Sequence, residues 1–178
     1  MLNAVSPFVR IAVRNGLLAA ALGFVFLLAL YFMGKHPFLF PVYVDFRIVL
    51  FGVFMVMGLH ELREDYQHGV LSFGQAMITN LLFTIVFATG VAAALWLWCL
   101  VYPDFLTDYI ALATEQIRAI EPQIVEQLGK DSYQRNLERL PDTHGGDLAL
   151  DYWVKSFILS FFISMILSVI LRRQPKTN

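Results

Sequence analysis

The feature that most constrains this chain is a set of four apolar blocks, each close to the length of a membrane span. At about 1.5 Å of rise per residue, about twenty helical residues match the roughly 30 Å hydrocarbon layer of a bilayer. Hydrophobic residues make up 58% of the chain and charged residues 15%, whereas soluble domains carry about 25% charged residues. The sequence therefore predicts an all-α integral membrane protein, a single domain with four transmembrane helices over residues 10–33, 43–60, 73–101 and 150–172.

Charge and composition exclude several classes of partner. The formal net charge of −1 argues against a nucleic-acid partner, which would need a basic face. The single cysteine, Cys99, lies inside an apolar block, so no intramolecular disulfide can form. The chain has no Cys/His spacing typical of a metal site and no nucleotide-binding or nucleophile motif. We expect no metal and no cofactor, and the lipid bilayer as the main partner.

A long polar region, residues 104–151, separates the third and fourth predicted spans. Pro122 should kink or divide its first helix, and Gly129 should end that helix. A shorter helix over about 132–140 should follow, and Pro141 and the pair Gly145-Gly146 should end it. The sequence thus predicts an extramembrane helical hairpin over about 104–141. Its apolar seam repeats at intervals of four and three residues, at Leu106, Ile110, Ala113, Ile117, Ile120 and Ile124.

A short polar turn, residues 60–76, joins the second and third predicted spans. Ser72 and Gln75 fit a capping box that starts the third span, and Gly69 suits the reversal of the chain. Either these residues only complete a turn, or the turn is a contact surface for a cytoplasmic protein or an anionic lipid. The residues expected to make that contact are Arg63, Gly69, Ser72, Phe73 and Gly74.

The same turn contains the best candidates for chemistry. His60, Glu64 and His68 are each four residues apart, so a continuous helix would place two imidazoles and a carboxylate on one face. Gly69 argues against a helix through position 68, and polar residues are expected in any turn outside the bilayer. We therefore predict no catalytic residues and no metal ligands here.

The distribution of Lys and Arg predicts the orientation, because short cytoplasmic segments are rich in both. One side collects Arg10, Arg14, Arg63, Arg172, Arg173 and Lys176. Aromatic residues typical of a membrane interface gather at the other side: Tyr43, Trp96, Trp98, Tyr102, Tyr152 and Trp153. We predict that both termini and the turn at 60–76 are cytoplasmic.

Stripes of small or polar residues run along the third and fourth predicted spans. Thr84, Ala88 and Ala92 recur every four residues, and Thr79 and Asn80 are available for interhelical hydrogen bonds. The fourth span carries a serine stripe, which is either a close-packing surface or the polar lining of a pathway. In both cases it should face protein rather than lipid. Its members are Ser156, Ser160, Ser164 and Ser168.

Arg47 is a charge about one turn inside the second predicted span. A charge at mid-bilayer costs roughly 2.5–3.5 kcal/mol on insertion scales. Either Arg47 extends its side chain to the membrane surface, or it pairs with Asp45 or Asp151 and fixes helix packing or a ligand.

The turn at 60–76 resembles a bacterial family labelled "domain of unknown function 4199", whose members are small four-span membrane proteins. The family's string is an arginine-led polar turn, a glycine and an aliphatic-Ser-Phe-Gly-Lys-Ala restart. Gln75 stands where a lysine is common, and Tyr102-Pro103-Asp104-Phe105 also fits the family. The resemblance implies a bacterial cytoplasmic (inner) membrane and assigns no activity. The matching residues are Arg63, Gly69, Leu71, Ser72, Phe73, Gly74 and Ala76.

Three functions are compatible with this sequence. The favoured one is a non-enzymatic, multi-pass membrane protein that scaffolds or assists a membrane partner, which is another protein or a second copy of the chain. The second is a small transporter or channel subunit, for which the serine stripe would line the pathway. The third is an enzyme acting on a lipid-linked substrate through His60, Glu64 and His68 at the cytoplasmic face.

Overall fold

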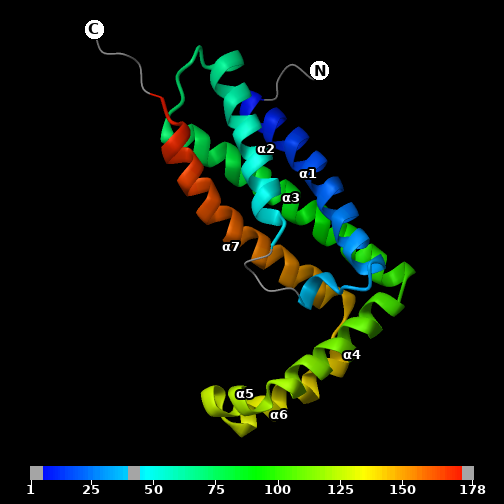
Figure 1. Ribbon diagram of the computed structural model, residues 1–178. Helices are drawn as coiled ribbons and strands as arrows, with labels where there is room; N and C mark the ends of the chain where they lie inside the picture. The colour runs from blue at the N-terminus through cyan, green and yellow to red at the C-terminus, as the bar shows by residue number, and fades with distance from the viewer. Residues whose placement is uncertain (1–5, 40–44, 174–178) are drawn as a thin grey trace.

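The computed structural model describes residues 6–39 and 45–173, and every regular element among them is helical. The predicted all-α class is therefore confirmed. Three short turns, η2 (Pro37–Leu39), η4 (Leu62–Tyr66) and η5 (Leu140–Asp142), connect the longer helices. Those helices are α1 (Pro7–Phe32), α2 (Arg47–Glu61), α3 (Phe73–Val101), α4 (Asp104–Ala119), α5 (Glu121–Leu128), α6 (Lys130–Arg139) and α7 (Gly145–Leu171) (Figure 1).

Three of these helices, α1, α3 and α7, are long and apolar enough to cross a membrane. The predicted second span corresponds to α2, which has only 15 residues. At about 1.5 Å per residue it is about 22 Å long, shorter than the hydrocarbon layer. The first residues of that predicted span, 43 and 44, lie outside the described residues. A fourth crossing by α2 therefore stays a prediction.

Four helices, α1, α2, α3 and α7, pack together and are called the body here. Within the body, α3 has its most extensive contacts with α7 and α1, while α2 lies mainly against α7 and α1. Aromatic rings fill the centre, where Phe51 of α2 lies 4.8 Å from Phe87 of α3, measured between ring centroids. Both side chains are fully buried.

Local sequence explains where two of the helices begin. At α3 the predicted capping box is confirmed, because Gln75 N donates to Ser72 Oγ (3.3 Å) and Ser72 N donates to Gln75 Oε1 (3.0 Å). The short helix α6 ends at Arg139, close to Pro141 as predicted. The role predicted for Gly145-Gly146 is wrong, since these two glycines are the first residues of α7. His144 N donates to Asp147 Oδ2 (2.8 Å), so a carboxylate caps α7 before the predicted start at 150.

The three helices α4, α5 and α6, called the arm here, extend away from the body (Figure 1). As predicted, the first helix is divided beside Pro122, which lies in the first turn of α5, and Gly129, with φ +82°, ends α5. The arm therefore has three helices rather than the two of a hairpin. Tyr133 of α6 donates to Glu121 Oε2 of α5 (3.2 Å). The arm leaves the body at the end opposite the α2–α3 turn (Figure 1).

The α2–α3 turn, the first residues of α1 and the last residues of α7 lie at one end of the body (Figure 1). Leu71 and Arg173 form a two-way backbone bridge, with N–O distances of 2.9 and 2.8 Å. Arg14 of α1 pairs with Glu61 at the end of α2. The end of α7 and the start of α1 are thus both joined to this turn.

We predict that Gly16→Ala weakens the body, because a Cβ at Gly16 would lie 2.9 Å from Val86 Cβ and 3.1 Å from the Phe83 carbonyl oxygen. Overpacking of this kind costs about 1–3 kcal/mol. The matched control is Gly52→Ala, since a Cβ there meets nothing within 4 Å and alanine favours a helix by up to about 1 kcal/mol. Unfolding in detergent should give a lower midpoint for Gly16→Ala only; a lower midpoint for Gly52→Ala as well would contradict the packing described.

Candidate functional site

A buried ion pair joins the start of α2 to α7. Arg47 Nε lies 2.8 Å from both carboxylate oxygens of Asp45, and Arg47 Nη2 also pairs with Asp45. Arg47 Nη1 donates to Ser156 Oγ of α7 (2.9 Å), and the guanidinium lies 4.7 Å from the centroid of the Tyr152 ring. The two charged side chains are 10% and 9% exposed, so each charge is buried together with its partner.

This geometry decides between the interpretations of Arg47. The side chain is paired inside the protein rather than extended to the membrane surface, and the Arg47–Asp45 contact is present. A contact with Asp151 is not formed, because the Asp151 carboxylate instead accepts from Lys155 Nζ (2.6 Å). Arg47 is therefore a connection between α2 and α7.

The serine stripe of α7 faces protein, as predicted, and all four side chains have no exposed surface. Ser156 accepts from Arg47, Ser160 bonds Thr84 of α3, and Ser164 donates to the Met77 sulfur (3.4 Å). The serines thus contact residues of α2 and α3, as expected for a surface on which helices pack closely. They favour packing over the polar pathway as the account of the stripe.

Some buried polar atoms of the body have no partner within the described chain. They are Asn15 Nδ2 of α1, Asn80 Nδ2 and Trp98 Nε1 of α3, and the Tyr152 hydroxyl and Ser168 Oγ of α7. Asn15, Asn80 and Ser168 are 4%, 1% and 0% exposed. An unpaired buried polar group costs about 1–3 kcal/mol.

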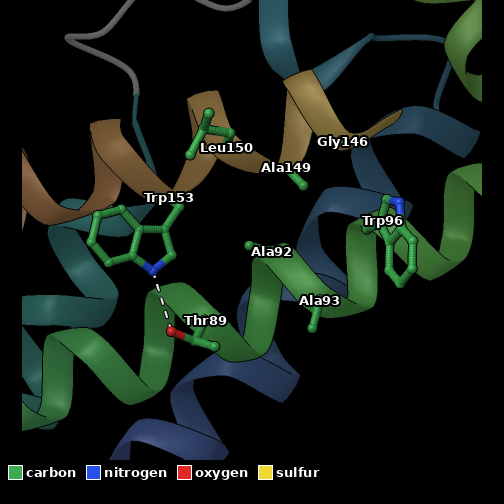
Figure 2. A pocket seen from close by; sticks show the side chains of 8 residues that line it. All are labelled: Thr89, Ala92, Ala93, Trp96, Gly146, Ala149, Leu150 and Trp153. Atoms are coloured by element: carbon green, nitrogen blue, oxygen red, sulfur yellow. Dashed lines mark hydrogen bonds between the residues drawn. The ribbon is translucent and has the colours of Figure 1, made fainter. Parts of the chain in front are cut away.

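An open apolar groove lies between α3 and α7, with a volume of about 580 Å³. In Figure 2, Trp96 and Trp153 lie toward opposite ends of the groove, with small side chains between them. Trp153 Nε1 donates to Thr89 Oγ1 (3.2 Å), so the two polar groups satisfy each other. The lining residues, none of them ionisable, are Thr89, Ala92, Ala93, Trp96, Gly146, Ala149, Leu150 and Trp153.

The groove is a feature that sequence reasoning missed. The sequence places Trp96 and Trp153 in an aromatic belt and Ala92 in a stripe of small residues, so some of the lining residues are recognisable. Gly146 and Ala149 are not, because they precede the predicted fourth span. Their position beside α3 depends on α7 beginning at Gly145.

The predicted contact residues of the α2–α3 turn lie close together in the chain and are partly exposed. Arg63 Nε donates to Glu64 Oε1 (2.8 Å), and the Arg63 carbonyl accepts from Gly69 N (2.8 Å). Gly69 has φ +84°, a left-handed conformation that favours glycine. The structure therefore gives Gly69 a role in reversing the chain.

Phe73 and Gly74 follow the Ser72 cap and face outward. Phe73 is 41% exposed, and a Cβ on Gly74 would meet nothing within 4 Å. Packing among residues 6–39 and 45–173 thus gives no reason for a glycine at position 74. Ser72, Phe73 and Gly74 are all exposed on the surface of this part of the chain.

The three residues considered for metal binding are not on one continuous helix. The helix that contains His60 continues as the π-turn η4 and ends at Tyr66, before His68, whose φ is +50°. Within residues 6–39 and 45–173, no group of three His, Cys, Asp or Glu residues is arranged to hold a metal ion.

We predict that Arg47→Met destabilises the body by about 3–5 kcal/mol, because it leaves the Asp45 carboxylate buried without its partner. The double variant Asp45→Leu/Arg47→Met should recover most of that loss, since no charge is then buried. Lys155→Met breaks the exposed Asp151 pair and should cost at most about 1 kcal/mol. If Arg47→Met and Lys155→Met lowered the free energy of unfolding in detergent equally, Arg47 would not be a buried connection between α2 and α7.

The comparisons with known proteins agree with the resemblance inferred from the turn. No curated protein and no solved structure gives a significant match. The model of the family described as "Protein of unknown function (DUF4199)" matches residues 14–173, which is nearly the whole chain. The chain therefore belongs to the DUF4199 family.

Proposed function

We propose that this chain is a four-span, non-enzymatic membrane protein that scaffolds a partner by holding one of the partner's transmembrane helices in the groove between α3 and α7. The observation that carries the proposal is the composition of the groove. Its middle is made of alanine and glycine, its ends are tryptophans, and its one polar pair is satisfied internally.

Small residues favour a helix as the occupant. In lipid, helices associate through close packing rather than through the hydrophobic effect, and small side chains let two backbones approach. Ala92, Ala93, Gly146 and Ala149 provide such a surface across both α3 and α7. Trp96, which is 49% exposed, would supply a rigid aromatic contact of the kind that dominates many interfaces.

Chain direction supports a fourth crossing by α2. Both α1 and α3 begin at the end of the body that holds the α2–α3 turn (Figure 1). The chain must therefore return to that end between α1 and α3, and α2 is the helix that reaches the turn. The π-turn η4 continues it to Tyr66, and the Asp45–Arg47 pair is neutralised within the protein, which lowers the cost of burial.

The proposed orientation follows from the charges. The end with the turn carries Arg10, Arg14, Arg63, Arg172 and Arg173, and basic residues favour the cytoplasmic side. The arm would then stand on the opposite side of a bacterial inner membrane. At the cytoplasmic end, Arg63, Gly69, Ser72, Phe73 and Gly74 form a second proposed contact, for a cytoplasmic protein or an anionic lipid headgroup.

A transport role is the second candidate. It is favoured by the unpartnered buried atoms Asn15 Nδ2, Asn80 Nδ2 and Ser168 Oγ, which come from three different helices of the body. Water or a polar solute between these helices would satisfy them. The scaffold is preferred because its groove is already open, whereas these polar groups are enclosed by packed side chains.

We expect a photo-crosslinking residue at Ala93 to form an adduct of defined mass in native membranes, because Ala93 lines the groove. The control site is Phe162 of α7, which is 56% exposed and does not line the groove, and it should give no such adduct. Ala149→Leu should fill the groove and remove the Ala93 adduct.

Mass spectrometry of the adduct identifies the partner as another membrane protein or as a second copy of this chain. Either identity supports a scaffold. Adducts of equal yield at Ala93 and Phe162, or an Ala93 adduct with lipid alone, would contradict the proposal.

A further inference from the structure

His36 is a buried histidine at the junction between the body and the arm. It follows the end of α1, precedes η2, and is 5% exposed. Its Nε2 lies 3.1 Å from the carbonyl oxygen of Phe105, in the first turn of α4. The imidazole centroid lies 4.6 Å from the Phe105 ring and 5.3 Å from the Tyr109 ring. One side chain of the body thus contacts the start of the arm on several sides.

The hydrogen bond determines which ring nitrogen carries the proton. A carbonyl oxygen only accepts, so Nε2 donates and Nδ1 holds a lone pair in the neutral ring. His36 Nδ1 is buried and has no partner among residues 6–39 and 45–173. Protonation would add a second donor and a positive charge at this buried Nδ1, where the described residues supply no acceptor, and such a charge is strongly unfavourable.

The groups around His36 come from three elements. From α1, the Tyr31 hydroxyl donates to the Asp108 carboxylate of α4 (2.7 Å), and Phe38 of η2 contributes an uncharged ring. From α4, besides Asp108, Tyr109 contributes a phenol whose pKa is raised by burial and by the charge of Asp151.

Burial affects the pKa of His36 more strongly than the nearby carboxylate does. Desolvation lowers the pKa of His36, while the Phe105 carbonyl and the Asp108 carboxylate act in the opposite direction without reversing it. The neutral form is therefore the one that fits the docked arm.

The position of the arm depends on this junction. Outside the arm and η5, α4 contacts α3, which it directly follows, and η2, next to His36. The Tyr31–Asp108 hydrogen bond also joins α4 to α1. Phe105 is fully buried at the junction, whereas α5 and α6 extend away from the body (Figure 1). A change at His36 would therefore alter how the whole arm is held.

We propose that His36 is an acid-sensitive latch that holds the arm against the body while the imidazole is neutral and releases it when the imidazole is protonated. The released arm binds more protons than the docked arm, so docking is strongest above the ordinary histidine pKa of about 6.5. Docking weakens as pH falls through that value toward the lower pKa of the docked state. Below the lower pKa, both states are protonated and no further loss follows.

The test is a distance measurement between spin labels in the full chain, reconstituted in lipid nanodiscs. Labels at Leu100→Cys at the end of α3 and Gln134→Cys in α6, both exposed, report the position of the arm in a Cys99→Ala background. At about pH 8 we expect a narrow distance distribution, and at about pH 5 a broad one, on either side of the ordinary histidine pKa of about 6.5.

Two variants make the result specific. His36→Gln keeps an N–H donor for the Phe105 carbonyl but cannot be charged near neutral pH, so its distribution should stay narrow at both pH values. His144→Gln changes an exposed histidine at the start of α7 and should keep the wild-type shift. Unchanged wild-type distances between the two pH values, or a full shift in His36→Gln, would overturn the proposal.

Discussion

Close packing of α3 against α7 is the constraint on which the rest of this structure depends. Thr84 and Ser160 bond across the interface, and Ala88 is fully buried beside them. Small side chains bring the two backbones near each other, and the hydroxyls satisfy one another where no water is available. The same pair also forms the groove beside Ala92 and Gly146, so the packing and the proposed site are two parts of one helix pair.

The short helix α2 is positioned by polar contacts of Arg47. Its Arg47 reaches Ser156 of α7 and is neutralised by Asp45, two residues earlier in the chain. A buried pair of this kind adds little to the free energy of unfolding. Removing one partner is nevertheless strongly destabilising, because it leaves the other charge buried and unpaired. The Arg47 contact thus specifies which face of α2 lies against α7.

Much of the architecture could be predicted from local patterns in the sequence. The long apolar blocks predicted α1, α3 and α7, and the Ser72–Gln75 pattern predicted the start of α3, because a capping box is determined by four consecutive residues. The inward face of the serine stripe followed from its four-residue period. Each of these features depends on residues that are neighbours along one helix.

The features that the sequence did not reveal depend on residues far apart in the chain. The start of α7 at Gly145 was missed because two adjacent glycines favour a break when considered alone, and Asp147 caps the helix instead. The groove requires Trp96 and Trp153 to lie along the same helix pair, and the Arg47 contact requires α2 beside Ser156. Periodicity identifies a helix face but does not say which helix that face meets.

The central claim is that the body crosses a membrane, with the α2–α3 turn and the arm on opposite sides. Single cysteines at Asp65 and Gln123, both exposed, test it in a Cys99→Ala background with a thiol reagent that does not cross membranes. We predict that intact spheroplasts are labelled at position 123 only, and that position 65 is labelled after lysis. Labelling of both positions in intact spheroplasts, or of neither until lysis, would contradict the account.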